Sequence, residues 1–248
     1  LAVTLEPSLA AGMQKGLTYL KTYPYDCVEQ TVSRFLPNIV TFRALQTLGT
    51  QNHELEVQLA QMVGVSVQRL YSLQNPDGGW GWWTNEASSP TITAYVLLGL
   101  AEAQRSDFII DQAVMDRAST YLYQWLDQTR PDTYRDHNER AMALYALAEA
   151  GMGDLARVVA LYDKRADMAQ YAKGYLAMAL QILNPDETKR LTTLANELSN
   201  AAIVSASGAH WEEAQRDPWA MNTTTRTTAV VLRSLIRMQP DNKLLPNV

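Results

Sequence analysis

The residues best suited to chemistry are one thiol and one carboxamide near the start of the chain. Cys27 and Gln30 lie three positions apart within residues 23–31, YPYDCVEQT. Residues at this spacing meet across one turn at the start of a helix. Attack of the Cys27 sulfur on the Gln30 side-chain amide would expel ammonia and leave a thioester. A thiol, with a pKa of about 8.5, is a far better leaving group than a hydroxyl, so this acyl group would transfer readily to an amine or to water.

A thioester survives only where water is kept away from it. Tyr23 and Tyr25 stand just before Cys27, and we expect their rings to cover the bond, although ordinary core packing is an alternative role for both. Glu29 lies between the two reactive residues. It is interpreted either as part of the reactive motif or as an acidic residue that a first helical turn favours because of the helix dipole.

Composition excludes several other kinds of site. The chain of 248 residues has one cysteine, which rules out an intrachain disulfide framework and a Cys-rich zinc site. His53 and His210 have no partner at ligand spacing, so we expect no metal. The net charge of −5 without a Lys/Arg cluster argues against nucleic-acid binding. Apolar runs such as Ala94–Ala101 are too short to span a membrane, and we expect no direct membrane contact.

The elements that must position Cys27 are predicted to be helices. Apolar residues recur at intervals of three and four, Ala and Leu dominate, and the alternation typical of strands is absent, which indicates an all-α chain. One segment repeats, as TAYVLLGLAEA and RAMALYALAEA, and helices this rich in Ala and Leu are usually buried. Its copies start at residues 93, 140, 173 and 228, and more loosely at 41. Amphipathic partner helices are expected at 54–73, 111–128 and 187–198.

This spacing predicts one helical hairpin per repeat and an α/α toroid of about five to six hairpins, although an open helical solenoid has the same period. No linker or low-complexity tract interrupts the chain, so residues 1–248 are expected to form one domain. The chain begins at Leu1 without an initiator Met. We therefore interpret it as a piece excised from a larger multidomain parent.

The breaks between helices carry clear turn signals. The run NPDGG at 75–79 predicts a turn, and SSPT at 88–91 predicts a helix start with Pro in its first turn. Residues 203–211 are the least helical and indicate a short hairpin or an ordered loop. The tryptophans that follow the first turn are expected to plug the toroid rather than to form a carbohydrate or lipid platform; they are Trp80, Trp82 and Trp83.

The stretch CVEQ at 27–30 resembles the C-x-E-Q thioester motif of the α2-macroglobulin and complement family. The flanking YPYDC and SRFLPN resemble its bacterial branch, and the likeness continues at QNPDGGWGWW (74–83) and TTTRTTA (223–229). The resemblance thus spans most of the chain. It implies an α/α toroid, an internal cross-link between Cys27 and Gln30, and no separate cofactor.

The resemblance also implies a function. Proteolysis of a bait segment elsewhere in the parent would expose the thioester, and Gln30 would then acylate a surface lysine of the attacking protease. This is single-use acyl transfer by an endopeptidase inhibitor in host defence, and not an enzyme turnover. The expected partners are target proteases or other amine-bearing proteins, together with the other domains of the parent. The expected location is extracytoplasmic and periplasmic, with membrane anchoring of the parent left open.

The chain departs from the family pattern at two positions. Vertebrate members usually carry Gly where this chain has Val28, although the bacterial branch tolerates larger residues there. Some complement proteins use a downstream His that converts the thioester to an acyl-imidazole, and His137 lies at a comparable distance from Cys27. The sequence around His137 does not match the complement pattern. We therefore expect a solvated loop residue at this position, and direct attack by lysine.

Other functions remain open at this stage. Terpene cyclases and prenyltransferases have turns similar to residues 74–80, but this chain lacks their acidic D-x-D-D cluster and a zinc site. A glycosidase of this architecture would need two facing carboxylates, and no pair stands out; Trp211-Glu212-Glu213 is expected to be a solvated loop edge. An interaction module whose thioester never forms is a further alternative. Exact mass tests it, because thioester closure removes one ammonia and blocks the only thiol.

Overall fold

The computed structural model describes residues 27–47, 53–128, 133–206, 208–215, 217 and 223–248. Within these ranges, one small hairpin of strands accompanies a set of helices, which confirms the all-α class. The elements are α2 (Val28–Thr47), α3 (His53–Leu73), α4 (Pro90–Arg105), α5 (Gln112–Gln128), α6 (Tyr134–Glu149), α7 (Leu155–Tyr162), η1 (Arg165–Asp167), α8 (Gln170–Leu183), α9 (Thr188–Asn200), β1 (Ile203–Ser205), β2 (Gly208–His210), α10 (Thr224–Met238) and η3 (Leu245–Asn247).

The repeat found in the sequence corresponds to alternate helices. Its copies from 93, 140, 173 and 228 lie in α4, α6, α8 and α10, and the loose copy from 41 begins in the second half of α2. The amphipathic partners are α3, α5 and α9, as predicted. Helix α7 was not among the predicted elements; Asp154 caps it by accepting hydrogen bonds from the backbone N–H groups of Ala156 and Arg157. The expected hairpin is also present, with β1 antiparallel to β2.

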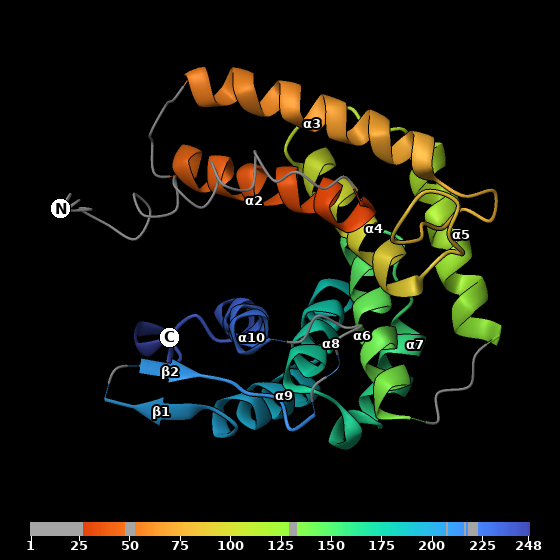
Figure 1. Cartoon of the computed structure of the whole chain (residues 1–248). Coiled ribbons are helices and arrows are strands. Elements are labelled where there is room, and N and C mark those ends of the chain that lie inside the picture. Colours follow the sequence, from red (N-terminus) through yellow and green to blue (C-terminus); the bar gives the residue numbers. More distant parts are fainter. Residues whose placement is uncertain (1–26, 48–52, 129–132, 207, 216, 218–222) are drawn as a thin grey trace. The chain divides into compact units, whose positions relative to one another are not determined.

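Contacts divide the chain into two compact units at Ala118 and Ser119, within α5. In the first unit, α2 packs against both α3 and α4 (Figure 1). Gly99 allows α4 to approach α2 closely, because a Cβ atom there would lie 2.9 Å from Val32 Cγ1 and 3.1 Å from Phe35 Cζ. Since Val32 and Phe35 are fully buried, this contact fixes α2, the helix that carries the candidate thioester residues.

In the second unit, α8 lies at the centre. It packs against α6 and α10, and also against α7 and α9 (Figure 1). Its residues from Leu176 to Leu180 are all fully buried, as expected for a helix rich in Ala and Leu on nearly all sides. The closure of the hairpins into a toroid and the single domain over residues 1–248 stay predictions.

Two tryptophans make the same pair of anchoring contacts, one in each unit. Trp80 is fully buried, donates its indole N–H to Leu70 O at 2.8 Å, and donates its backbone N–H to Thr93 Oγ1 at 3.0 Å. Trp211 repeats both contacts, with Leu198 O at 2.7 Å and Thr228 Oγ1 at 3.0 Å. Each tryptophan therefore joins one amphipathic helix, through its indole, to the next repeat helix, through its backbone N–H.

We expect Trp80→Ala to lower the free energy of unfolding by about 3–5 kcal/mol, because it leaves a cavity and an unpaired Leu70 carbonyl. Trp83→Ala is the matched control, since the Trp83 side chain is 52% exposed. Urea unfolding followed by circular dichroism measures both variants. Equal losses in the two variants would contradict the anchoring role of Trp80.

Candidate functional site

Cys27 is the residue immediately before α2 and occupies the N-cap position of that helix. It is 4% exposed, and its carbonyl accepts hydrogen bonds from Thr31 N at 3.0 Å and from Thr31 Oγ1 at 2.9 Å. Its Sγ accepts the backbone N–H of Gln30 at 3.4 Å. In a capping box, a Ser or Thr at the N-cap accepts the N–H of the third helical residue, and a Glu or Gln there reaches back. Cys27 and Gln30 occupy these two positions with sulfur in place of oxygen.

The Gln30 side chain has an oxygen that the surrounding protein does not satisfy. Gln30 Oε1 is buried, and within the described part of the chain it has no hydrogen-bond partner. A buried carbonyl oxygen without a partner costs free energy, so this amide is a candidate for chemistry rather than for structural support. The capping turn thus places the buried Cys27 thiol against the backbone of Gln30, one helical turn further along the chain.

Burial and hydrogen bonding have opposite effects on the pKa of the Cys27 thiol. Burial raises its pKa, and the nearby Glu29 carboxylate raises it further. The backbone N–H groups of Gln30 and Glu29 lower it, because they donate toward the sulfur. Burial has the larger effect, so the free thiol is protonated at neutral pH. The same N–H groups would stabilise a thiolate at this position.

Glu29 is tied into a polar chain that the sequence reading missed. Ser33 Oγ donates to Glu29 Oε1 at 2.6 Å, and it also lies 3.0 Å from the hydroxyl of Tyr95 on α4. Glu29 lies in the first turn of α2, where the helix dipole favours an acidic residue. The hydrogen bond from Ser33 also fixes its carboxylate. The four-residue spacing of Glu29 and Ser33 could have predicted their contact on one helix face. No sequence pattern links Tyr95 to them.

The Gly-rich loop before α4 supports the start of α2. The backbone N–H of Val28 donates to Trp82 O at 3.0 Å. The loop is shaped by Gly78, whose φ of +90° suits glycine and whose Cβ position would lie 2.4 Å from Arg117 O. Trp80 is buried as expected, Trp82 is half-buried, and Trp83 is too exposed to act as a plug. The loop thus satisfies the first free N–H of α2.

The remaining predicted site residues lie elsewhere. Tyr23 and Tyr25 are outside the described residues, so their shielding role stays a prediction. His137 was expected to be a solvated loop residue, and this is wrong. A capping box between Thr133 and Asp136 starts α6 ahead of it, so His137 lies in the first turn of this helix, where it is 5% exposed. Neither ring nitrogen has a hydrogen-bond partner among the described residues.

Residues 211–213 were expected to form a solvated loop edge, and this is wrong for Trp211 and Glu213. Trp211 is fully buried. The Glu213 carboxylate accepts the backbone N–H groups of Gln170 at 2.9 Å and Tyr171 at 3.0 Å. Because Ala169, at the N-cap of α8, has no side chain for this purpose, Glu213 caps α8 from a distant loop.

No group of three or more His, Cys, Asp or Glu side chains in the described ranges is placed to hold a metal ion. His210 instead lies 3.3 Å from Glu212 Oε1. Of the helices that the structure describes, none combines the length and the apolar character needed to cross a bilayer.

Comparisons with known proteins give the following likenesses. The family model for the A-macroglobulin TED domain matches residues 2–143. An alpha-2-macroglobulin of Thermotoga maritima is 24% identical over 250 residues, which cover 94% of this chain and 15% of the relative. The structure of Salmonella alpha-2-macroglobulin reacted with methylamine matches 93% of this chain and 15% of its own, with a TM-score of 0.73 and 21% identity.

A second solved structure has a similar fold. Native alpha-2-macroglobulin from Escherichia coli, spanning domain MG7 to the C-terminus, matches 94% of this chain and 36% of its own, with a TM-score of 0.70 and 22% identity. At these identities the structural matches show the fold alone. The present chain therefore spans only a small part of the proteins that it resembles.

We expect a free Cys27 thiol to react with iodoacetamide only at elevated pH, because the thiolate is the reactive form and burial raises the pKa of Cys27. The pH midpoint of the alkylation rate should lie above that of the urea-unfolded chain, which is the control. Since the folded pKa is the higher one, the free energy of unfolding should fall as the pH rises above the unfolded pKa. A folded midpoint at or below the unfolded value would contradict the effect of burial.

Proposed function

The chain belongs to the A-macroglobulin TED domain family, and on that basis we propose that Cys27 and Gln30 form an internal thioester that captures proteases covalently. The observation that carries the proposal is the buried capping turn, in which the Gln30 N–H lies 3.4 Å from Cys27 Sγ. This turn holds the buried sulfur against the backbone of the residue whose side-chain amide it would attack. Such placement lowers the entropic cost of bringing the two groups together.

Formation of the thioester is a balanced exchange within the turn. The sulfur attacks the side-chain carbonyl carbon of Gln30, the new C–S bond forms, and the C–N bond breaks. The thiol proton leaves with the NH₂ group as ammonia. Burial of Cys27 supports persistence of the product, because hydrolysis needs water at the same carbon.

In the capture step, the sulfur is the leaving group instead of the nucleophile. A lysine amine attacks the thioester carbon, a C–N bond forms, and the C–S bond breaks with the sulfur leaving as thiolate. The backbone N–H groups of Gln30 and Glu29, which lower the pKa of the thiol, would stabilise that thiolate. Glu29, held by Ser33 at 2.6 Å, is our candidate for taking the proton that the attacking amine loses.

The wider role that we propose concerns the parent protein. Cleavage of a bait segment would expose the thioester, so that lysines of the attacking protease are acylated once and the protease is retained. This makes the parent an inhibitor rather than an enzyme, with no cofactor beyond the thioester, and a periplasmic location suits the task. Membership of the TED domain family and the much greater length of the alpha-2-macroglobulin relative support this proposal.

We expect Cys27→Ala and Gln30→Ala to abolish covalent capture, because each removes one end of the thioester. The freshly isolated full-length parent should have a mass lower by one ammonia, take up methylamine, and form adducts with trypsin that survive denaturing electrophoresis. Gln68→Ala, at an exposed position on α3, is the matched control and should behave as the wild type. A free Cys27 thiol with no methylamine uptake in the wild-type parent would leave only a non-reactive interaction module.

We expect His137→Asn to leave methylamine uptake unchanged, because our proposal has lysine attack the thioester directly. The measurement compares methylamine and glycerol incorporation by mass spectrometry in the wild-type and variant parents. Thermal unfolding of both serves as the control for loss of the buried imidazole. Glycerol uptake by the wild type that disappears in the variant would instead assign His137 to acyl transfer.

A further inference from the structure

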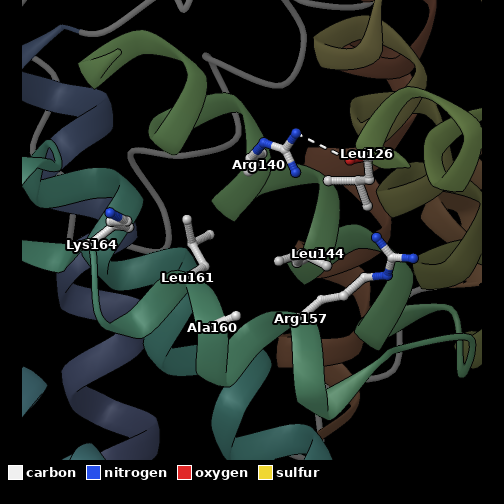
Figure 2. Close-up of a pocket in the computed structure, with 7 residues that line it drawn as sticks. All are labelled: Leu126, Arg140, Leu144, Arg157, Ala160, Leu161 and Lys164. Atoms are coloured by element: carbon white, nitrogen blue, oxygen red, sulfur yellow. Dashed lines mark hydrogen bonds between the residues drawn. The ribbon is translucent and has the colours of Figure 1, made fainter. Parts of the chain in front are cut away.

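A cavity of about 320 Å³ lies in the unit formed by residues 119–248, between the end of α5 and helices α6 and α7 (Figure 2). This volume is at the lower end of the range for small-molecule pockets, roughly 300–1,000 Å³. The cavity shares no residue with the turn that holds Cys27. Its lining consists of Leu126, Arg140, Leu144, Arg157, Ala160, Leu161 and Lys164.

The centre of this lining is aliphatic. Leu126, Leu144 and Leu161 are 4%, 2% and 6% exposed, and Figure 2 shows their side chains around one space, which they reach from three different helices. Ala160 borders the same space from α7 and is itself exposed. Leucine side chains beside an open space lack the contacts that a close-packed interior supplies, so an apolar molecule that filled the space would gain those contacts.

The buried basic residue of the lining, Arg140, has partners within the protein. It donates from Nη2 to Leu126 O at 3.1 Å and lies 5.5 Å from the centroid of the Trp125 ring. Burial lowers the pKa of Arg140, and the carboxylates of Asp136 and Asp127 oppose that effect. Its charge is therefore compensated by neighbouring groups of the same unit, and it does not require an anion from outside.

The other two basic residues do not converge on a common point. Arg157 is held by Asp127 at 2.7 Å and by Asp154 at 3.2 Å, and its guanidinium carbon lies 5.4 Å from the centroid of the Tyr123 ring. Lys164 is exposed, and Figure 2 shows it on the opposite side of the cavity from Arg157. Three nearby carboxylates thus stand against three basic groups, so the charges around the cavity do not select an ion.

We propose that this cavity binds an uncharged molecule with a medium-length alkyl chain. The chain would lie on the three leucines and exchange water for their side chains, which favours binding in proportion to the apolar area buried. Apolar cavities in proteins take up neutral apolar molecules without any polar contact. An ionised group, or a sugar with many hydroxyls, would lose its hydration in the cavity without new hydrogen bonds from the leucines. The proposal does not depend on the thioester.

1-Octanol, titrated below its solubility limit into the 248-residue chain and followed by calorimetry, tests the proposal. We expect saturable binding and a rise in the thermal unfolding midpoint, because the ligand binds the folded chain. 1,8-Octanediol should bind about tenfold more weakly, since its second hydroxyl would be buried against leucine side chains. Octanoate should bind no more tightly than octanol, because the charges of the lining are already compensated.

A variant pair tests the position of the ligand without changing any charge. Ala160→Trp would fill the cavity from α7 and should abolish octanol binding. Ala156→Trp, at an exposed position one turn earlier on α7, is the matched control and should bind octanol as the wild type does. Circular dichroism of both variants checks that each is folded.

Four results would overturn the proposal. The first is the absence of saturable octanol binding, and the second is equal octanol affinity of the two tryptophan variants. The third is octanoate binding more tightly than octanol, which would assign the site to anions. The fourth is tighter binding of N-acetyl-leucinamide than of octanol, because the cavity would then fit a side chain of a protein segment.

Discussion

The placement of the Cys27 sulfur over the N-terminal turn of α2 is the constraint on which the rest of the site depends. The contact from Gln30 N to Cys27 Sγ is local, but it is useful only if the helix end is buried and does not fray. Two other elements, the loop before α4 and α4 itself, provide this. Trp82 O satisfies the Val28 N–H, Gly99 admits the close contact with α4, and Ser33 links Glu29 to Tyr95. The chemistry that we propose for Cys27 and Gln30 therefore relies on the packing of the first unit.

Features that depend on near neighbours could be predicted from the sequence. The spacing of Cys27 and Gln30 is that of a capping box, whose geometry is set within one turn. The repeat helices were recognisable because a period of three to four residues is sustained over several turns. Helix α7 was missed because its eight residues are too few to show such a period, and its start depends on a single Asp154 cap.

Features that depend on residues far along the chain could not be predicted. Ser33 and Tyr95 are 62 positions apart, and no local pattern links them. Glu213 caps α8 from 43 positions away along the chain. No local pattern indicates this contact, so the sequence predicted a solvated carboxylate. His137 was misread for a related reason: the Thr133 cap shows where the helix starts, but the burial of its first turn depends on what packs against it.

The anchors made by Trp80 and Trp211 hold loops of different length in the same way. In each, an indole and a threonine hydroxyl fix the two ends of a loop, with 13 positions from Trp80 to Thr93 and 17 from Trp211 to Thr228. The anchor thus tolerates insertions between its two ends. In the first unit this segment supplies the Trp82 carbonyl that supports α2, and in the second it supplies the Glu213 carboxylate that caps α8. The same anchor therefore bounds two loops that support different helices, α2 in the first unit and α8 in the second.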